Sequence, residues 1–243
     1  MAATNYPAWS TSDFIYKGVM HSLGTPEILS LIENDFVFHS DDTLVCTYPK
    51  QGTTLVTEMV WLIKNKADVE AAKKTSLSDR TAFLELERPG APQREVDKAA
   101  KLTRPRLLKS HLPWDVLQRG VSTKGVKVVH VMRNPKDSMI SLFHFARNKK
   151  NWSLGKDFEF NKFYEMFRDG HCPYGSYFDY TVNWWAQRHR DNILFLKYED
   201  ILADKLGNVR RIAQFLDVQL SSEEEARVVE HTSFSAMQEN PMV

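Results

Sequence analysis

One segment of the chain carries the residue types of an anion-binding loop. Residues 48–54 read Tyr-Pro-Lys-Gln-Gly-Thr-Thr and lie between an apolar run and a stretch with helical spacing. Glycine lets backbone amides approach an anion closely, and a helix start presents unpaired N–H groups. Lys50 adds a positive charge, and Thr53 and Thr54 add hydroxyl donors. The segment predicts a phosphate site, although Lys50 precedes the glycine, unlike in the usual nucleoside-triphosphate loop. An ordinary strand-to-helix turn capped by threonine is the alternative.

A second candidate anion site centres on Arg133. This residue follows an apolar run, and Asn134 then opens a helix that carries Ser141. Seven positions, about two helical turns, separate Asn134 from Ser141, so both face the same side. A guanidinium beside a hydroxyl, at the crevice where doubly wound sheets bind ligands, suits a second phosphate. The alternative is a structural ion pair between Arg133 and Asp137 with Ser141 facing solvent.

Lys109 and His111 follow another apolar run. Two residues apart on an extended chain, their side chains share one face. A histidine accepts a proton near neutral pH, and a neighbouring lysine stabilises negative charge. The pair predicts acid–base chemistry at a strand end, with a structural histidine as the alternative. The other seven histidines show no spacing that suits a metal site.

Four short apolar, β-branched runs are candidate strands to position these side chains. They are Thr43–Tyr48, Arg106–Ser110, Lys127–Met132 and Ile193–Lys197. Runs that are apolar on both faces and alternate with helices are typical of a parallel sheet covered on both sides. The sequence therefore predicts an α/β fold with a doubly wound parallel sheet flanked by helices. Because no linker is visible, we expect one domain over residues 1–243.

Helical spacing and caps predict three helices around this sheet. One begins at Thr53 or Thr54, one is capped by Asn134, and a third, amphipathic helix covers residues 201–216. Residues 64–100 and 149–172 lack a steady period. We expect these two segments to form walls of a binding pocket, since functional residues concentrate on such connections.

The composition excludes several classes of protein. The chain has 32 Lys and Arg against 31 Asp and Glu, a net charge of +1, so no strong field favours nucleic acid or an anionic membrane. The longest apolar run, Met59–Ile63, has five residues, far below the about 18 that span a bilayer. Residues 1–10 lack the apolar core of a signal peptide. The two cysteines, Cys46 and Cys172, are expected to be free thiols in a reducing compartment. We expect a cytoplasmic enzyme.

Taken together, these segments resemble the cytosolic sulfotransferases. The resemblance covers Tyr48–Thr54, Lys109–Pro113, Arg133–Ser141, Leu196–Asp200 and His231–Val243, in the family's order. It implies a P-loop-like nucleotide-binding architecture and transfer of a sulfuryl group from 3′-phosphoadenylyl sulfate (PAPS) to the hydroxyl or amine of a small acceptor. A phenolic or alcoholic acceptor is expected, with adenosine 3′,5′-bisphosphate (PAP) as product and no metal. The absence of a Gly-Lys-Ser/Thr loop disfavours a kinase.

The resemblance also implies a role for each candidate residue. His111 is implied as the general base, with Lys50 and Lys109 as the other catalytic residues. The implied cofactor-binding residues are Lys50, Gln51, Gly52, Thr53, Thr54, Leu55, Arg133, Ser141, Tyr198, Thr232 and Phe234. The acceptor pocket is expected to be apolar and aromatic, as small-ligand sites usually are. Its candidate residues are Tyr16, Phe83, Phe143, Phe145 and Tyr174, for each of which a core role is the alternative.

The sequence departs from the family at several positions. Gln51 stands where serine is usual, and Leu55 stands where a tryptophan stacks on adenine. The family's C-terminal Arg-Lys-Gly motif and the dimerisation segment after it are absent before Val243. Either the chain is incomplete or the 3′-phosphate site lacks one wall, and a homodimer stays an open possibility. These departures motivate an alternative function, a catalytically weak nucleotide-binding member of the same fold.

Overall fold

The central sheet has five parallel strands in the order β4-β5-β3-β6-β7. The computed structural model describes residues 6–87, 90–149, 152 and 154–243. The strands are β3 (Thr43–Thr47), β4 (Ala82–Phe83), β5 (Leu107–Ser110), β6 (Lys127–Met132) and β7 (Ile193–Lys197). Thr43 in β3 pairs with Leu107 on one side and Lys127 on the other, so the carboxyl ends of these strands lie side by side. The doubly wound parallel sheet is confirmed.

An antiparallel hairpin precedes the sheet, formed by β1 (Phe14–Tyr16) and β2 (Val19–His21). The helices before β6 are α1 (Pro26–Asn34), α2 (Thr53–Lys64), α3 (Val69–Lys74), α4 (Leu77–Arg80), α5 (Glu95–Lys101) and α6 (Trp114–Lys124). Those after β6 are α7 (Pro135–Asn148), α8 (Phe160–Arg168), α9 (Tyr177–Trp185), α10 (Tyr198–Ala203), α11 (Lys205–Phe215), α12 (Ser222–His231) and α13 (Phe234–Glu239).

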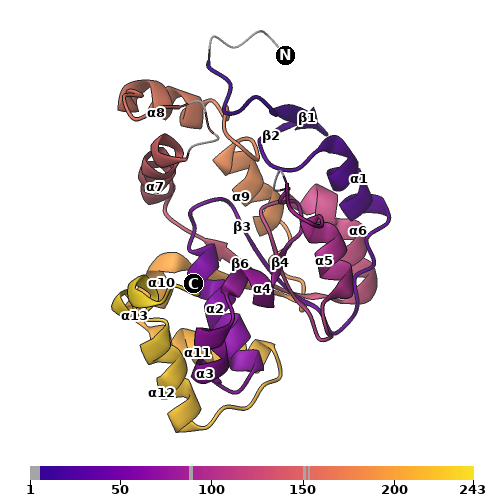
Figure 1. Cartoon of the computed structure of the whole chain (residues 1–243), viewed down its shortest axis with the longest axis vertical. Helices are drawn as coiled ribbons and strands as arrows, with labels where there is room; N and C mark the ends of the chain where they lie inside the picture. The colour runs from indigo at the N-terminus through magenta and orange to yellow at the C-terminus, as the bar shows by residue number, and fades with distance from the viewer. Residues whose placement is uncertain (1–5, 88–89, 150–151, 153) are drawn as a thin grey trace.

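Helices cover both faces of the sheet because its strands alternate between two apolar cores. Leu44 and Cys46 of β3 belong to the core that α1, α6 and α9 complete. Val45, between them, belongs to the core that α2, α11 and α12 complete. Figure 1 shows these two groups of helices on opposite sides of the sheet, with α7 and α8 beyond one end of it. This arrangement leaves the carboxyl ends of the strands free to carry polar side chains.

Two predicted helix starts are confirmed and one predicted helix is wrong. The α2 helix begins at Thr53, and the Asn134 side chain caps α7 by accepting a hydrogen bond from the backbone N–H of Lys136. The helix predicted over 201–216 is broken at Asp204, whose side chain accepts from the N–H of Gly207 and begins α11 afresh. An aspartate favours such a cap over a helix interior because its oxygens compete for backbone donors.

The predicted strands need smaller corrections. The runs predicted to start at Arg106 and to end at Tyr48 are each one residue too long. The two-residue β4 and the β1–β2 hairpin were not predicted, because segments so short carry no clear alternation. Both cysteines are buried and unpaired, as expected. Within the described ranges, none of the helices combines the length and apolar character that crossing a bilayer needs.

Candidate active site

A cavity of about 660 Å³ lies at the carboxyl ends of β3, β5 and β6. Most of the predicted site residues line it. They are Lys50, Gly52, Thr53, Thr54, Leu55, Phe83, Lys109, His111, Arg133, Ser141, Phe145, Tyr174, Tyr198, Thr232 and Phe234. Segments that are distant in sequence therefore meet in one cavity, and the loop before α2 forms part of its wall.

The loop before α2 turns through two left-handed backbone conformations. Lys50 has φ 70° and Gly52 has φ 91°. A Cβ at Gly52 would stand 2.5 Å from Cδ2 of Tyr198, so only glycine fits beneath this ring. Left-handed backbone at a lysine is uncommon and costs free energy, which is a feature of functional sites. No side chain caps the first turn of α2, so its backbone donors stay available to an anion.

The ring of His111 is fixed on three sides. Its Nδ1 lies 2.8 Å from the carbonyl oxygen of Thr47, which only accepts, so Nδ1 carries the hydrogen and Nε2 is the basic nitrogen. Edge-to-face contacts hold the ring against Phe83 and Tyr174, with centroids 5.0 and 5.4 Å away. Burial, followed by the charges of Lys109 and other lysines, lowers the pKa of His111 to about 3. The imidazole is therefore neutral near pH 7.

Cations gather around this histidine. The ammonium of Lys50 lies 4.2 Å from the ring centroid of Phe145, and that of Lys109 lies 4.5 Å from the ring centroid of Phe83. Burial and the charge of Arg133 lower the pKa of Lys50. Among the described residues that line the cavity, none is acidic. The site is therefore built for a highly anionic ligand.

Arg133 connects the two predicted anion sites. Its Nη1 donates to the carbonyl oxygen of Lys50 at 3.1 Å, and its guanidinium lies 4.5 Å from the ring centroid of Tyr198. The buried Nε has no hydrogen-bond partner in the described part of the chain. The ion pair with Asp137 that the sequence left open is not formed among these residues. An orphaned donor beside the loop fits a phosphate ligand.

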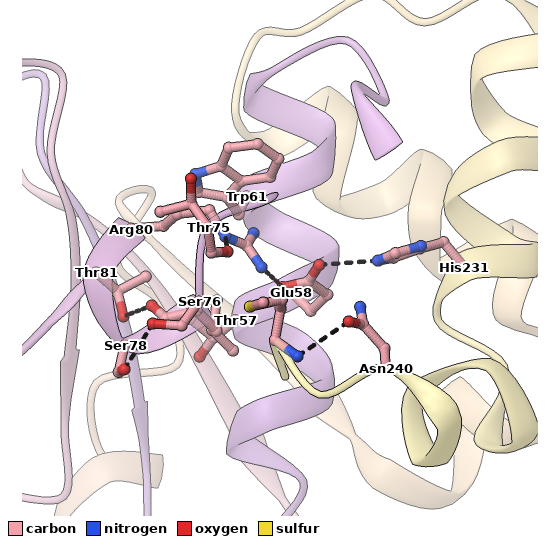
Figure 2. Close-up of polar contacts among 12 residues, drawn as sticks. Thr57, Glu58, Trp61, Thr75, Ser76, Ser78, Arg80, Thr81, His231 and Asn240 are labelled. Carbon is pink, nitrogen blue, oxygen red and sulfur yellow. Dashed lines mark hydrogen bonds and ion pairs between the residues drawn. The ribbon is translucent and has the colours of Figure 1, made fainter. Parts of the chain in front are cut away.

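Two buried glutamates support the site from behind. Glu85 accepts hydrogen bonds from the backbone N–H of His111 at 2.6 Å, the Ser110 hydroxyl at 2.9 Å and the Tyr174 hydroxyl at 3.2 Å. Glu58, on α2, pairs with Arg80 at 2.8 Å and with His231 at 3.1 Å (Figure 2). The first glutamate fixes the base, and the second connects the helix of the phosphate loop to the residue before Thr232.

Three predicted residues do not line the cavity. Gln51 turns inward, where its Oε1 accepts from the backbone N–H of Tyr48 at 3.0 Å. Tyr16 donates to Glu33 on α1 and lines a different cavity. Phe143 is in the apolar core, against Phe163 of α8, because it lies on the inner face of α7. The expectation that Tyr16 and Phe143 line the acceptor pocket is therefore corrected.

Sequence reasoning missed several residues of the cavity wall. They are Leu23, Pro49, Lys149, Trp152, Leu202, Lys205, Met237, Gln238 and Val243. Lys149 and Trp152 lie in the segment 149–172 that was expected to form a pocket wall, but no spacing identified them individually. Lys205 reaches the cavity because the break at Asp204 redirects the chain there. No group of three or more potential metal ligands occurs among the described residues.

Comparisons with known proteins agree on one family. The model of the sulfotransferase domain matches residues 40–243. Sulfotransferase 1C2 of Rattus norvegicus is 40% identical over 202 residues, which cover 83% of this chain and 67% of that protein. Retinol dehydratase in complex with androsterone and the inactive cofactor PAP superposes with a TM-score of 0.82 at 31% identity, covering 93% of this chain and 74% of that one. Mouse sulfotransferase SULT7A1 complexed with PAP superposes with a TM-score of 0.79 at 26% identity, covering 95% of this chain and 77% of that one.

Proposed function

The chain belongs to the cytosolic sulfotransferase family, and from that premise we propose how its residues act. The protein transfers a sulfuryl group from PAPS to a small acceptor, with PAP as product. We propose that the accepting atom is the oxygen or nitrogen of a hydroxyl or amine, and that phenols and alcohols are the preferred class. The observation that carries this proposal is a neutral, fixed histidine beside several cations in one cavity.

The residues at the carboxyl ends of the strands fit the donor. Lys50, the first-turn amides of α2 and the hydroxyls of Thr53 and Thr54 are proposed to hold the 5′-phosphosulfate. Arg133 and Ser141 are proposed to hold the 3′-phosphate, which would pair the guanidinium's orphaned Nε. Adenine would lie among Leu55, Tyr198, Thr232 and Phe234, all on the cavity wall. When bound, the donor supplies the sulfuryl group and leaves as PAP.

His111 is proposed as the general base. Its Nε2 takes the proton of the acceptor hydroxyl as the acceptor oxygen bonds to sulfur and the bond from sulfur to the phosphate oxygen breaks. Lys50 stabilises the charge that develops on the departing oxygen, and Lys109 the charge on the transferring group. Burial and, after it, the lysine charges hold the pKa of His111 low. Because bound phosphates offset these charges, we expect the pKa of His111 to rise when the nucleotide binds.

Removing His111 tests this assignment. With PAPS and 4-nitrophenol, we expect His111→Ala to lose at least about 100-fold in kcat, the usual contribution of a general base. PAP titration should give the same affinity in the variant as in the wild type, since the histidine acts on the acceptor. Lys50→Ala should lose both rate and PAP affinity. Activity of His111→Ala within about threefold of wild type would remove this residue as the base.

Arg133 is tested by two titrations at one salt concentration, which keeps screening constant. Arg133→Ala should weaken PAP binding about tenfold to a hundredfold, since hydrogen bonds to charged groups are strong. Adenosine 5′-monophosphate, which lacks the 3′-phosphate, should bind the variant and the wild type almost equally. Equal weakening of both nucleotides would assign Arg133 only to its contact with the Lys50 carbonyl oxygen.

Two further proposals concern the whole chain. The family and the two unpaired thiols support a location in the cytoplasm, a reducing compartment. The five-stranded sheet, shared by both apolar cores, supports one sulfotransferase domain over 1–243. The comparisons with known proteins do not favour the alternative of a catalytically weak nucleotide-binding protein.

A further inference from the structure

The proposed function gives no role to two lysines of the cavity wall, Lys149 and Lys205. The ammonium of Lys205 donates to the carbonyl oxygen of Thr232 at 2.6 Å, which leaves Lys149 to be explained. Lys149 follows α7 and lines both the 660 Å³ cavity and an adjoining cavity of about 1040 Å³. Its ammonium lies 5.2 Å from the ring centroid of Phe145 and 4.9 Å from that of Trp152. This lysine therefore stands where the two cavities meet, between aromatic rings.

No carboxylate balances the charge of Lys149. Throughout the described part of the chain no ion pair joins it to Asp or Glu, and the sequence has neither residue at the positions left undescribed. Burial lowers the pKa of Lys149. Burial also lowers the pKa of Lys64, but there Asp42 and Asp41 oppose the shift. A half-buried ammonium that lacks a carboxylate partner is stabilised when an anion binds beside it.

The position of Lys149 is on the acceptor side of the site. Its charge contributes, after burial, to the lowered pKa values of His111 and Lys50, so its ammonium lies near both residues. The Phe145 ring lies against the ammonium of Lys50 as well as that of Lys149. Arg133, by contrast, packs on Tyr198 at the nucleotide's proposed adenosine end. An anion near Lys149 would thus lie beyond the reacting centre, on the side of the second cavity.

We propose that Lys149 selects acceptors that carry, besides the reacting hydroxyl, an anionic group such as a carboxylate. This inference rests on the proposed function, since it assigns the remote part of the acceptor in the same site. The ammonium forms a charge-assisted hydrogen bond to the anionic group, and Phe145 and Trp152 pack against the apolar body of the acceptor. The established family chemistry at the sulfuryl group is unchanged.

A matched pair of phenols tests the proposal. The probes are 3-(4-hydroxyphenyl)propionate and its methyl ester, which differ in charge far from the reacting oxygen. In Lys149→Met, kcat/KM for the carboxylate should fall about tenfold, the low end for a charge-assisted bond because the site is partly open to solvent. For the ester it should change by less than about twofold. Lys149→Arg should keep the preference for the carboxylate.

Binding supplies a readout that does not depend on turnover. Calorimetric titration of the PAP complex with the carboxylate should show about tenfold weaker binding in Lys149→Met, while PAP affinity stays unchanged. Lys156→Met, which removes an exposed lysine outside the cavity, is the control for net charge. Equal losses for both phenols would assign Lys149 to the transferring group and overturn the proposal, as would no loss for either. If the wild type sulfonates neither phenol, the proposed acceptor class fails, and the titration alone decides the role of Lys149.

Discussion

Glu58 and Glu85 are equally buried, with 0% of each residue exposed, but their partners differ in charge. Glu58 pairs with the guanidinium of Arg80 and with the imidazole of His231 (Figure 2). The donors to Glu85 described above are neutral, the backbone N–H of His111 and the hydroxyls of Ser110 and Tyr174. Burial raises the pKa of Glu85 to about 7 against the effect of these hydrogen bonds. Neutral donors thus satisfy the oxygens of a buried carboxyl group without holding it ionised.

The difference in charge between their partners suits the structural role of each glutamate. Glu58 connects α2 to α4 and to the end of α12, so an ion pair there holds together elements that carry the nucleotide side of the site. Glu85 follows β4 and lies behind the base, where a permanent negative charge would raise the pKa of His111. A carboxyl group that is partly protonated near neutral pH positions the histidine with less charge beside it.

Breaking the charged pair should have the largest effect. Arg80→Met leaves the carboxylate of Glu58 without its guanidinium, and removal of one partner from a buried pair costs about 3–5 kcal/mol. We expect the free energy of unfolding, measured in urea, to fall by that amount. Arg94→Met breaks an exposed pair with Asp97 and should cost less than about 1 kcal/mol. A similar small loss in both variants would mean that Arg80 contributes no more than a surface charge.

The second prediction concerns the pH dependence that Glu85 imposes. Its folded pKa of about 7 is above the ordinary value, so the folded state binds more protons than the unfolded state between about pH 4.5 and pH 7. Stability from this group therefore falls as the pH rises through that range and is constant above it. Glu85→Gln removes the effect. Relative to wild type, the variant should be about 3 kcal/mol more stable at pH 8 than at pH 4.5.

Urea unfolding at several pH values measures this difference. Titrations elsewhere in the molecule cancel when the variant is compared with wild type at each pH. Glu70→Gln, which changes an exposed glutamate side chain, is the control for the substitution itself. A difference for Glu85→Gln that does not vary with pH would show that Glu85 ionises in the folded protein as it does in water, and the contrast with Glu58 would disappear.

The sequence predicts the parts of the site that are contiguous. His111 and Arg133 each stand directly after a strand, and Lys50 stands three residues after another. Parallel strands bring their carboxyl ends together, so motif order and topology suffice to place these residues. The two glutamates were not predicted, because their partners are distant in sequence. Glu58, for example, meets a histidine 173 positions away.

Side-chain direction is the other property of the site that the sequence does not predict. Gln51 belongs to the loop motif, yet its side chain turns inward to the backbone of Tyr48. Phe143 and Phe145 are two positions apart on α7, but the first is buried against α8 and the second lines the cavity. Tertiary packing decides these directions, and residue type alone does not reveal them. The break at Asp204 is similar, since an apolar period of helical spacing continues across it.

The smallest expected effect comes from one hydroxyl. Tyr174 donates to Oε1 of Glu85 at 3.2 Å, and this bond lowers the pKa of the carboxyl group. Tyr174→Phe keeps the ring against His111 and removes only the donor, so we expect a loss of about 1 kcal/mol in the free energy of unfolding. The pKa of Glu85 should rise further, which moves the upper end of its pH-dependent range above pH 7. PAP affinity should stay unchanged.

Tyr16→Phe is the matched control for this variant. Tyr16 also donates to a glutamate, Glu33, but the pKa of Glu33 is lowered by Lys17 and by Tyr16 itself. Loss of that hydroxyl should therefore lower the free energy of unfolding by a constant amount near pH 7, and this loss should shrink only at acidic pH, where Glu33 becomes protonated. If the difference between Tyr174→Phe and wild type also varies with pH only in the acidic range, Glu85 is ionised near neutral pH, and Glu58 and Glu85 differ only in their partners.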